Sequence, residues 1–204
     1  MSKLENMKIH IKNAKVKSQY IDKICYYFSK DYTAIQTSKE LEFSRQTINH
    51  YYKLIRSKII EKNILFDYKL IVYTLEQNCI EIKHLNIYNH DIFYVENKLG
   101  IFILNNQSAL PYNLSVFFKE KVENTLTNHK KANSARVLYN KENNSYVVSG
   151  FFKSDNKFEV FLQKRLRKFR GINKNNFYTH LNESLFRYNQ RNKDIYLETV
   201  YCLS

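Results

Sequence analysis

Glycine, proline and cysteine are scarce in this chain of 204 residues, which holds three glycines, one proline and three cysteines. So little glycine and proline excludes collagen-like and linker-like chains. The cysteines Cys25, Cys79 and Cys202 are far apart, without the paired spacing of a zinc site and in an odd number for disulfides. Residues 1–15 lack the apolar core of a signal peptide, and no apolar run is long enough to span a bilayer. These shortages predict a soluble intracellular protein without a membrane partner.

Acidic residues are also in the minority, since 33 Lys and Arg stand against 19 Asp and Glu, a formal net charge of +14. Residues 1–70 carry 14 basic and 7 acidic side chains, residues 71–150 carry 8 and 7, and residues 151–204 carry 11 and 5. Two basic ends around a neutral middle are typical of two surfaces for phosphate. Because 44% of the residues are hydrophobic, the chain can also bury a core. We therefore expect a folded protein that binds a polyanion.

The N-terminal third has the sequence pattern of a helix-turn-helix. Residues 20–28 place their apolar side chains on one helix face. Thr33 followed by Gln36 is typical of a capping box, which would open a second, short helix. After a tight turn, a cap at Ser44 opens a longer helix. Its apolar residues recur at helical spacing: Ile48, Tyr51, Ile55 and Ile59. A short helix, a turn and a longer helix define the motif.

In this motif the second helix lies in the major groove, and its first turns face the base edges. The residues expected there are Ser44, Arg45, Gln46, Asn49 and His50. Arg pairs well with guanine, whereas Asn and Gln match adenine. Lys53 and Arg56, a turn or two later, are better placed for phosphates. A plain helical hairpin with a solvated polar face is the alternative, and Glu42 supports it, because Gly often fills that turn position. The coincidence of caps, apolar spacing and base-reading side chains favours DNA binding.

From residue 79 onward the hydrophobic pattern changes to the alternation that is typical of strands. Strands are predicted at residues 79–88, 91–96, 99–104, 136–139 and 145–148. Asn97-Lys98 is a hairpin signal between the second and third strands. Pro111 can begin a helix with a buried stripe between the third and fourth strands. This order favours an α/β or α+β fold with a sheet of mixed direction.

The C-terminal third is predicted to be helical and basic. One helix has an apolar face from Phe158 to Phe169 and ends near Gly171. Five of the eight residues at 163–170 are basic, and none is acidic. A second helix follows and is expected to point Arg187 and Arg191 outward. A solvated helix face is the simpler explanation, but this density of cations favours a phosphate-binding surface.

The last third also resembles the end of small bacterial insertion-sequence transposases of the ISXO-like type. Those proteins close with a helix similar to RLxKFxGI and a segment similar to FYxHLxExxFRYNxR. The matching residues are Arg165, Leu166, Lys168, Phe169, Gly171, Ile172, Phe177, His180, Leu181, Glu183, Phe186, Arg187, Asn189 and Arg191. The upstream order agrees, with a helix-turn-helix, a linking segment and a strand that reads IEI. We therefore expect a helix-turn-helix module at 1–62, a linking segment at 63–78, and a ribonuclease H-like core with basic C-terminal helices at 79–204.

The resemblance implies a core that holds two divalent metals between three carboxylates, for phosphodiester cleavage and strand transfer. The positions that match those acids are Lys83, Asn140 and Asn156. None of them carries a negative charge, although divalent metals of this kind need anionic oxygen ligands. Other acids lie nearby, at Glu81, Asp91, Glu142, Asp155 and Glu159, and a small slip would let Asp155 or Glu159 replace one ligand. The resemblance thus implies a degenerate catalytic centre without a cofactor, and Mg²⁺ only if the acids are displaced.

We expect a DNA-binding protein descended from a transposase, catalytically inactive, that acts as a regulator or an architectural factor. Its partner would be double-stranded DNA, and it would act in the cytoplasm in association with the nucleoid. A homodimer is a possible oligomeric state. The C-terminal residues expected to contact the DNA backbone are Lys164, Arg165, Arg167, Lys168, Arg187 and Arg191. The first alternative is an active metal-dependent transposase with displaced acidic ligands. The second is an RNA-binding or protein-interaction module that retains its basic surfaces by inheritance.

Overall fold

The computed structural model describes residues 16–75, 79–98, 100–104, 114–128, 131–132, 134–140, 142–143, 145–153, 157–168 and 174–203. The chain divides into two compact units. The first, the helical unit, combines residues 1–64 with 171–204, and the second, the sheet unit, comprises 65–170. The segment predicted as one core at 79–204 therefore spans both units, and its last helices belong with the N-terminal helices.

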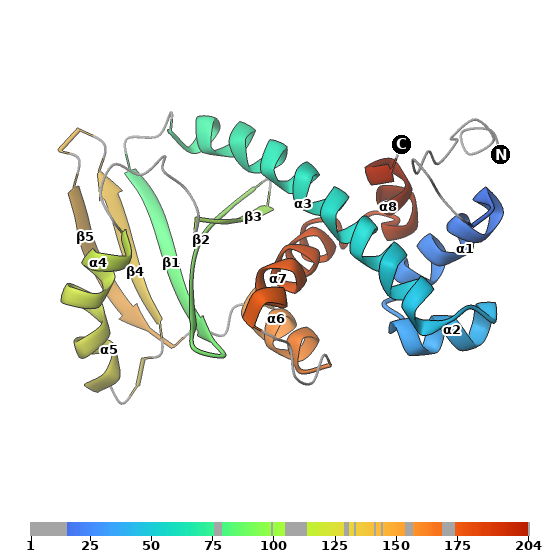
Figure 1. Cartoon of the computed structure of the whole chain (residues 1–204). Helices are drawn as coiled ribbons and strands as arrows, with labels where there is room; N and C mark the ends of the chain where they lie inside the picture. Colours follow the sequence, from blue (N-terminus) through green and yellow to red (C-terminus); the bar gives the residue numbers. More distant parts are fainter. Residues whose placement is uncertain are drawn as a thin grey trace. The chain divides into compact units, whose positions relative to one another are not determined.

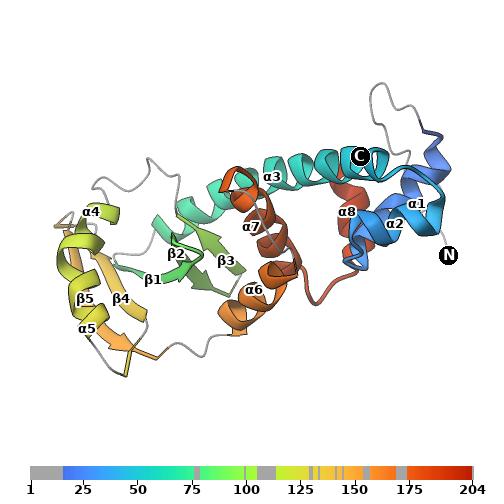
Figure 2. The same cartoon turned by 60° about the horizontal axis from the view of Figure 1, so that its bottom comes forward.

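The helical unit is built from both ends of the sequence (Figures 1 and 2). Its helices are α1 (Ser18–Ser29), α2 (Ala34–Leu41), the first part of α3 (Arg45–Leu75), α7 (Lys174–Asn189) and α8 (Ile195–Leu203). Its core consists of Ile21, Ile24, Cys25, Phe28, Ile48, Tyr51, Tyr52, Ile55, Ile59, Phe186, Val200 and Leu203. The apolar faces predicted at the N-terminus are thus confirmed. Within the expected linking segment at 63–78, α3 continues as a helix to residue 75, and residues 76–78 lie outside the described residues.

Local polar contacts fix where α2 and α3 begin. The Thr33 Oγ1 accepts a hydrogen bond from the Gln36 amide at 3.3 Å, and the Gln36 Oε1 accepts one from the Thr33 amide at 2.9 Å. Glu42 ends α2 in the left-handed region, with φ 58°. The Ser44 Oγ then accepts from the Thr47 amide at 3.1 Å and caps α3. Both predicted caps are confirmed. The left-handed Glu42 and the Ser44 cap together form the tight turn between the two helices.

The sheet unit contains five strands, β1 (Cys79–Ile87), β2 (His90–Asn97), β3 (Gly100–Ile103), β4 (Ser134–Asn140) and β5 (Ser145–Phe152). Their order across the sheet is β3-β2-β1-β4-β5. Every pairing between neighbours is antiparallel, so the expectation of mixed direction is wrong for the described strands. One reason is local, because residues 141–144 are too few for the crossover that parallel strands need. The chain is therefore an α+β protein.

Helices cover both faces of this sheet. On one face lie α4 (Leu114–Phe118), the π-helical turn η1 (Lys119–Glu123) and α5 (Asn124–Asn128) (Figure 1). They enclose a core of Ile82, Phe93, Val95, Leu114, Phe118, Val122, Ala135, Val137, Tyr139 and Tyr146. The predicted helix start at Pro111 lies outside the described residues.

On the other face lies α6 (Lys157–Arg167), whose Phe158 ring packs edge-on against the Tyr94 ring at 5.5 Å. The Tyr94 hydroxyl donates a hydrogen bond to the Glu159 Oε1 at 2.9 Å. The predicted end of α6, between Phe169 and Gly171, lies outside the described residues. Over the described part of the chain, no helix combines the length and the apolar character that a bilayer crossing requires.

Candidate nucleic-acid interface

The first two turns of α3 present polar side chains to solvent. Ile48, Tyr51, Tyr52 and Ile55 are buried, and this fixes which side of the helix points outward. The exposed side carries Ser44, Arg45, Gln46, Asn49, His50 and Lys53, as predicted. Within the described residues, Arg45, Gln46, Asn49 and Lys53 have no ion pair or hydrogen bond through their side chains. These four groups are therefore available to a ligand.

A buried hydrogen bond couples α2 to α3. The hydroxyls of Thr37 and Tyr52 lie 2.7 Å apart, and Thr37 is fully buried. Burial raises the pKa of Tyr52 to about 12, so its phenol remains protonated and can donate. This contact fixes the orientation of the exposed face relative to α2. Sequence reasoning missed it, because Thr37 looks like one more polar residue of a short surface helix.

Two arginines assigned to DNA are instead part of the helical unit's interior. The Arg56 Nε donates to the Glu183 Oε2 at 2.7 Å, and its side chain is only 15% exposed. Arg187 was predicted to point outward, and this is wrong, since its side chain is 8% exposed. It donates to the Glu183 Oε1 and to the Ser29 carbonyl, both at 3.0 Å, at the C-terminal end of α1. A buried carboxylate needs such partners, and the last carbonyls of a helix favour a cation.

Arg191 follows α7 and is exposed, in agreement with the prediction. Its guanidinium lies 4.1 Å from the centroid of the Tyr188 ring, and its Nη1 donates to the Tyr188 carbonyl at 2.7 Å. These contacts hold the side chain near the end of α7 and leave a cation at the surface.

Three of the four cations assigned to α6 and the residue that follows it are at the surface. Lys164, Arg167 and Lys168 are exposed. Arg165 is 5% exposed, so the expectation that it contacts DNA fails. It follows Leu162 by three residues, and residues at that spacing lie on one helix face. Phe158, on the same helix face, packs against Tyr94 of the sheet, and Leu162 is buried. Arg165 therefore points inward with them.

Lys83, the position that the resemblance assigns to the first acid, forms ion pairs with carboxylates. Its Nζ donates to the Glu96 Oε2 at 2.8 Å and lies 4.0 Å from the Glu81 Oε1. The Arg136 Nε lies 3.3 Å from the same Glu81 oxygen, and Lys83 and Arg136 are register partners on β1 and β4. This part of the sheet is an alternating cluster of two cations and two anions.

The position that the resemblance assigns to the second acid does not lie beside Lys83. Asn140 is paired with Cys79, four residues from Lys83 along β1, or about 13 Å at the usual rise of a strand. The Asn140 Oδ1 accepts from the Glu142 amide at 2.9 Å and so shapes the turn after β4. Asn156 and Asp155 lie outside the described residues.

The nearby acids of the sheet unit have other partners, since Glu159 binds the Tyr94 hydroxyl and the Asp91 Oδ1 lies 2.9 Å from the His84 Nε2. In the described ranges, no three His, Cys, Asp or Glu residues are grouped so that they could hold a metal.

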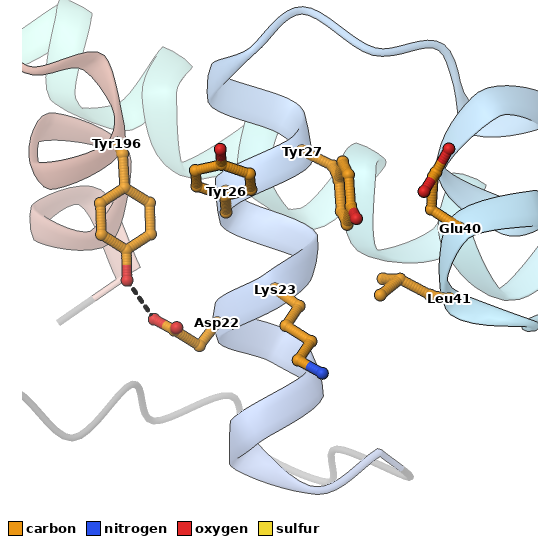
Figure 3. A pocket seen from close by; sticks show the side chains of 7 residues that line it. All are labelled: Asp22, Lys23, Tyr26, Tyr27, Glu40, Leu41 and Tyr196. Atoms are coloured by element: carbon orange, nitrogen blue, oxygen red, sulfur yellow. Dashed lines mark hydrogen bonds between the residues drawn. The ribbon is translucent and has the colours of Figure 1, made fainter.

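A hollow of about 430 Å³ in the helical unit is lined by α1, α2 and α8 (Figure 3). Carboxylates of Asp22 and Glu40 line it together with three tyrosines. The Tyr196 hydroxyl donates to Asp22. Burial and this carboxylate raise the pKa of Tyr196. With two carboxylates against one cation, Lys23, the lining of this hollow does not favour phosphate.

Comparison with known proteins gives no relative, because no family model, no curated protein and no solved structure matches the chain. The resemblance to ISXO-like transposases therefore remains a hypothesis from the sequence. What the chain binds has to be inferred from the exposed side chains of α3 and α6 and from Arg191.

Proposed function

We propose that this chain binds double-stranded DNA through the N-terminal turns of α3. One observation supports the proposal. The side chains of Arg45, Gln46 and Asn49 are exposed together on a helix whose opposite side is buried, and they form no hydrogen bond or ion pair with any described residue. Such a helix start, preceded by a short helix and a tight turn, has the form that enters a major groove.

The exposed groups match the chemistry of base edges and phosphates. Arg45 can donate two hydrogen bonds to guanine, and the amides of Gln46 and Asn49 can pair with adenine. Lys53 lies two turns from the helix start and suits a phosphate. The capped N-terminus at Ser44 adds the positive end of the helix dipole, which also favours phosphate.

The remaining exposed cations supply contacts without sequence preference. Lys164, Arg167 and Lys168 on α6 and Arg191 after α7 are suited to phosphate oxygens. Arg56, Arg165 and Arg187 have no part in this proposal, because their side chains are buried or paired.

From the sequence resemblance we infer that the ancestor was a transposase and that the present protein regulates or shapes DNA without cutting it. The ion pairs of Lys83 support this inference, because a metal placed there would meet a fixed ammonium group. The place of action would be the nucleoid in the cytoplasm.

The test is selection of bound duplexes from a random pool, followed by titration of single variants. Arg45→Ala should cost about 1–3 kcal/mol at the preferred site and relax the preference at one base position. Lys53→Ala should weaken binding evenly across sequences. Lys58→Ala is the matched control, because Lys58 lies about 140° around α3 from both residues at 3.6 residues per turn and pairs with Glu61 at 2.8 Å.

Two outcomes would contradict the proposal. One is an Arg45 variant that keeps the parent's preferred site and affinity. The other is displacement of the duplex by an equal concentration of RNA, which would favour an RNA-binding module instead.

A further inference from the structure

A second hollow, of about 260 Å³, lies in the sheet unit between the β1–β2 turn and α6. It is lined by Asn86, Ile87, Tyr88, Gln163 and Arg167. At roughly 30 Å³ for each water molecule of the liquid, its volume equals that of eight or nine waters. This is enough for one planar ring system and too little for a folded segment.

Tyr88 stands at this hollow in an unfavourable backbone conformation. Its φ is 52° and that of Asn89 is 61°, in a two-residue turn closed by the pair Ile87 and His90. Asn, Asp and Gly are preferred at such positions, whereas most other residues cost about 1–2 kcal/mol. The side chain of Tyr88 is also 55% exposed, so packing does not explain its presence. The turn therefore holds an aromatic ring at the surface at a cost in stability.

The polar groups around the ring have free hydrogen-bonding capacity. Among the described residues, neither the Gln163 amide nor the Arg167 guanidinium has a partner. The Asn86 Nδ2 donates to the Asp91 Oδ1 at 2.8 Å, and its Oδ1 remains as an acceptor. One hollow thus combines an exposed ring, a cation, and amide donors and acceptors.

We propose that this hollow binds one unpaired nucleobase of a single-stranded DNA segment. The base would stack on Tyr88, its edge would pair with the amides of Asn86 and Gln163, and Arg167 would face its ring or phosphate. Exposed Lys164 and Lys168, three residues before and one residue after Arg167, would meet the neighbouring phosphates. The choice of nucleic acid as ligand rests on the proposed function, in which Lys164, Arg167 and Lys168 also contact phosphates. Tyr88, Asn86 and Gln163 have no part in duplex binding, so substitutions at Tyr88 separate the two proposals.

The experiment compares the selected blunt duplex with the same duplex carrying a short single-stranded overhang, using the full chain. The parent should bind the overhang form at least about fivefold more tightly, as one stacked base contributes. Tyr88→Asn should remove this gain, and Tyr88→Phe should keep it, because the ring and not the hydroxyl is needed. Asn89→Gly is the control, since it changes the same turn without loss of a ring.

A fluorescent 2-aminopurine in the overhang gives a second readout. Its emission should fall on binding to the parent and to the Phe variant, and should stay high with Tyr88→Asn. Replacing the DNA overhang by RNA tests which nucleic acid supplies the unpaired base. An equal gain in affinity with the RNA overhang would show that the hollow recognises the base and not the sugar.

Equal affinity of the parent for blunt and overhang duplexes would overturn this proposal and leave duplex binding by α3 intact. The opposite result would overturn duplex binding by α3 instead. In that case the gain in affinity from the overhang would depend on Tyr88, while the Arg45 variant would bind the duplex like the parent. An overhang gain that Tyr88→Asn retains would place the single strand elsewhere.

Discussion

Arg56 on α3 and Glu183 on α7, 127 residues apart in the sequence, form a hydrogen-bonded ion pair of 2.7 Å. The same carboxylate accepts from the Arg187 Nε at 3.0 Å. Since the Glu183 side chain is only 2% exposed, one buried negative charge is neutralised by two guanidinium groups. Glu183 and Arg187 belong to the segment that resembles a transposase, and their role here is to join α7 to α3 and α1.

Removing this carboxylate should destabilise the protein strongly. Glu183→Gln removes the counter-charge of Arg56 and leaves Arg187 with Asp31, whose Oδ1 lies 3.8 Å from its Nε. Loss of one partner of a buried ion pair typically costs about 3–5 kcal/mol. Glu61→Gln is the control, because the Glu61 side chain is 61% exposed and pairs with Lys58 at 2.8 Å at the surface, where such pairs contribute about 0–1 kcal/mol. Denaturant unfolding measures both variants, and equal losses would contradict the assignment.

The turn between α2 and α3 should become more stable with glycine. Glu42 adopts φ 58°, a conformation that costs most side chains about 1–2 kcal/mol, while glycine adds entropy to the unfolded chain. We expect Glu42→Gly to raise the free energy of unfolding by about 0.5–1 kcal/mol. Glu40→Gly, inside α2, should instead lower it by about 1 kcal/mol. A melting temperature that changes in the same direction for both variants would be inconsistent with this role of the turn.

Acid should destabilise the sheet unit through His84. Burial lowers the pKa of His84 below 6.5, although Asp91 and Glu123 oppose the shift. As the pH falls, the unfolded chain therefore takes up this proton first. The contribution is fully present above about pH 6.5 and is lost as the pH falls toward the lower pKa of the folded state.

His84→Gln should flatten the pH dependence of unfolding in that window. Asp91 acts at lower pH: burial alone would raise its pKa, but hydrogen bonds from Asn86 and His84 bring it below 3.8. The substitution also changes packing against Phe118, which shifts the free energy of unfolding at every pH. The slope of this free energy between pH 4 and 7 therefore tests the assignment. A variant with the parent's slope would show that another group is responsible.

The cations of α6 should contribute to the salt dependence of DNA affinity. Replacing Lys164, Arg167 and Lys168 together by Ala should weaken binding to all sequences. It should also reduce the slope of log affinity against log salt by roughly 0.9 for each phosphate that the variant no longer neutralises. Replacing Lys17, Lys23 and Lys30, which flank or belong to α1 and are exposed, gives a control of equal charge. An unchanged slope in the α6 variant would refute the role of this helix at the DNA backbone.

We expect no cleavage or strand transfer with Mg²⁺ or Mn²⁺. Lys83 holds two carboxylates by its ammonium group, and Asn140 shapes a turn. Neither metal should raise the melting temperature, as binding to the folded state would. Metal-dependent nicking of labelled DNA, abolished by Asp155→Ala or Glu159→Ala, would instead restore the active transposase.

The N-terminal helices were predictable because local rules decide them. The helix starts predicted from the sequence pattern are capped in the structure, by Thr33 with Gln36 at α2 and by Ser44 with Thr47 at α3. The order of strands and helices followed in the same way from hydrophobic periodicity. The antiparallel pairing of β4 with β5 could also have been found, since four intervening residues permit only a hairpin.

Long-range pairing was not predictable. Glu183 and Arg187 lie one helical turn apart, so their ion pair is local. The sequence does not show that Ser29 and Arg56, far away along the chain, join this pair and that it is buried. Arg165 likewise occupies a helix position that a hydrophobic residue usually fills. The pocket at Tyr88 escaped notice as well, although a Tyr-Asn pair between two strand patterns is a turn signal, because only the fold brings it to Gln163 and Arg167.

The helical unit has a consequence for protein synthesis, because it is built from the two ends of the described sequence. The core around α1 and α3 includes Phe186, Val200 and Leu203, and Glu183 and Arg187 supply its buried charges. A ribosome makes these residues only after the whole sheet unit. The helix proposed to read DNA can therefore complete its core only after residues up to Leu203 have been made. Fragments that stop within the sheet unit would leave the apolar face of α1 to α3 uncovered. Proteases should degrade such fragments before they can compete with the full chain for DNA.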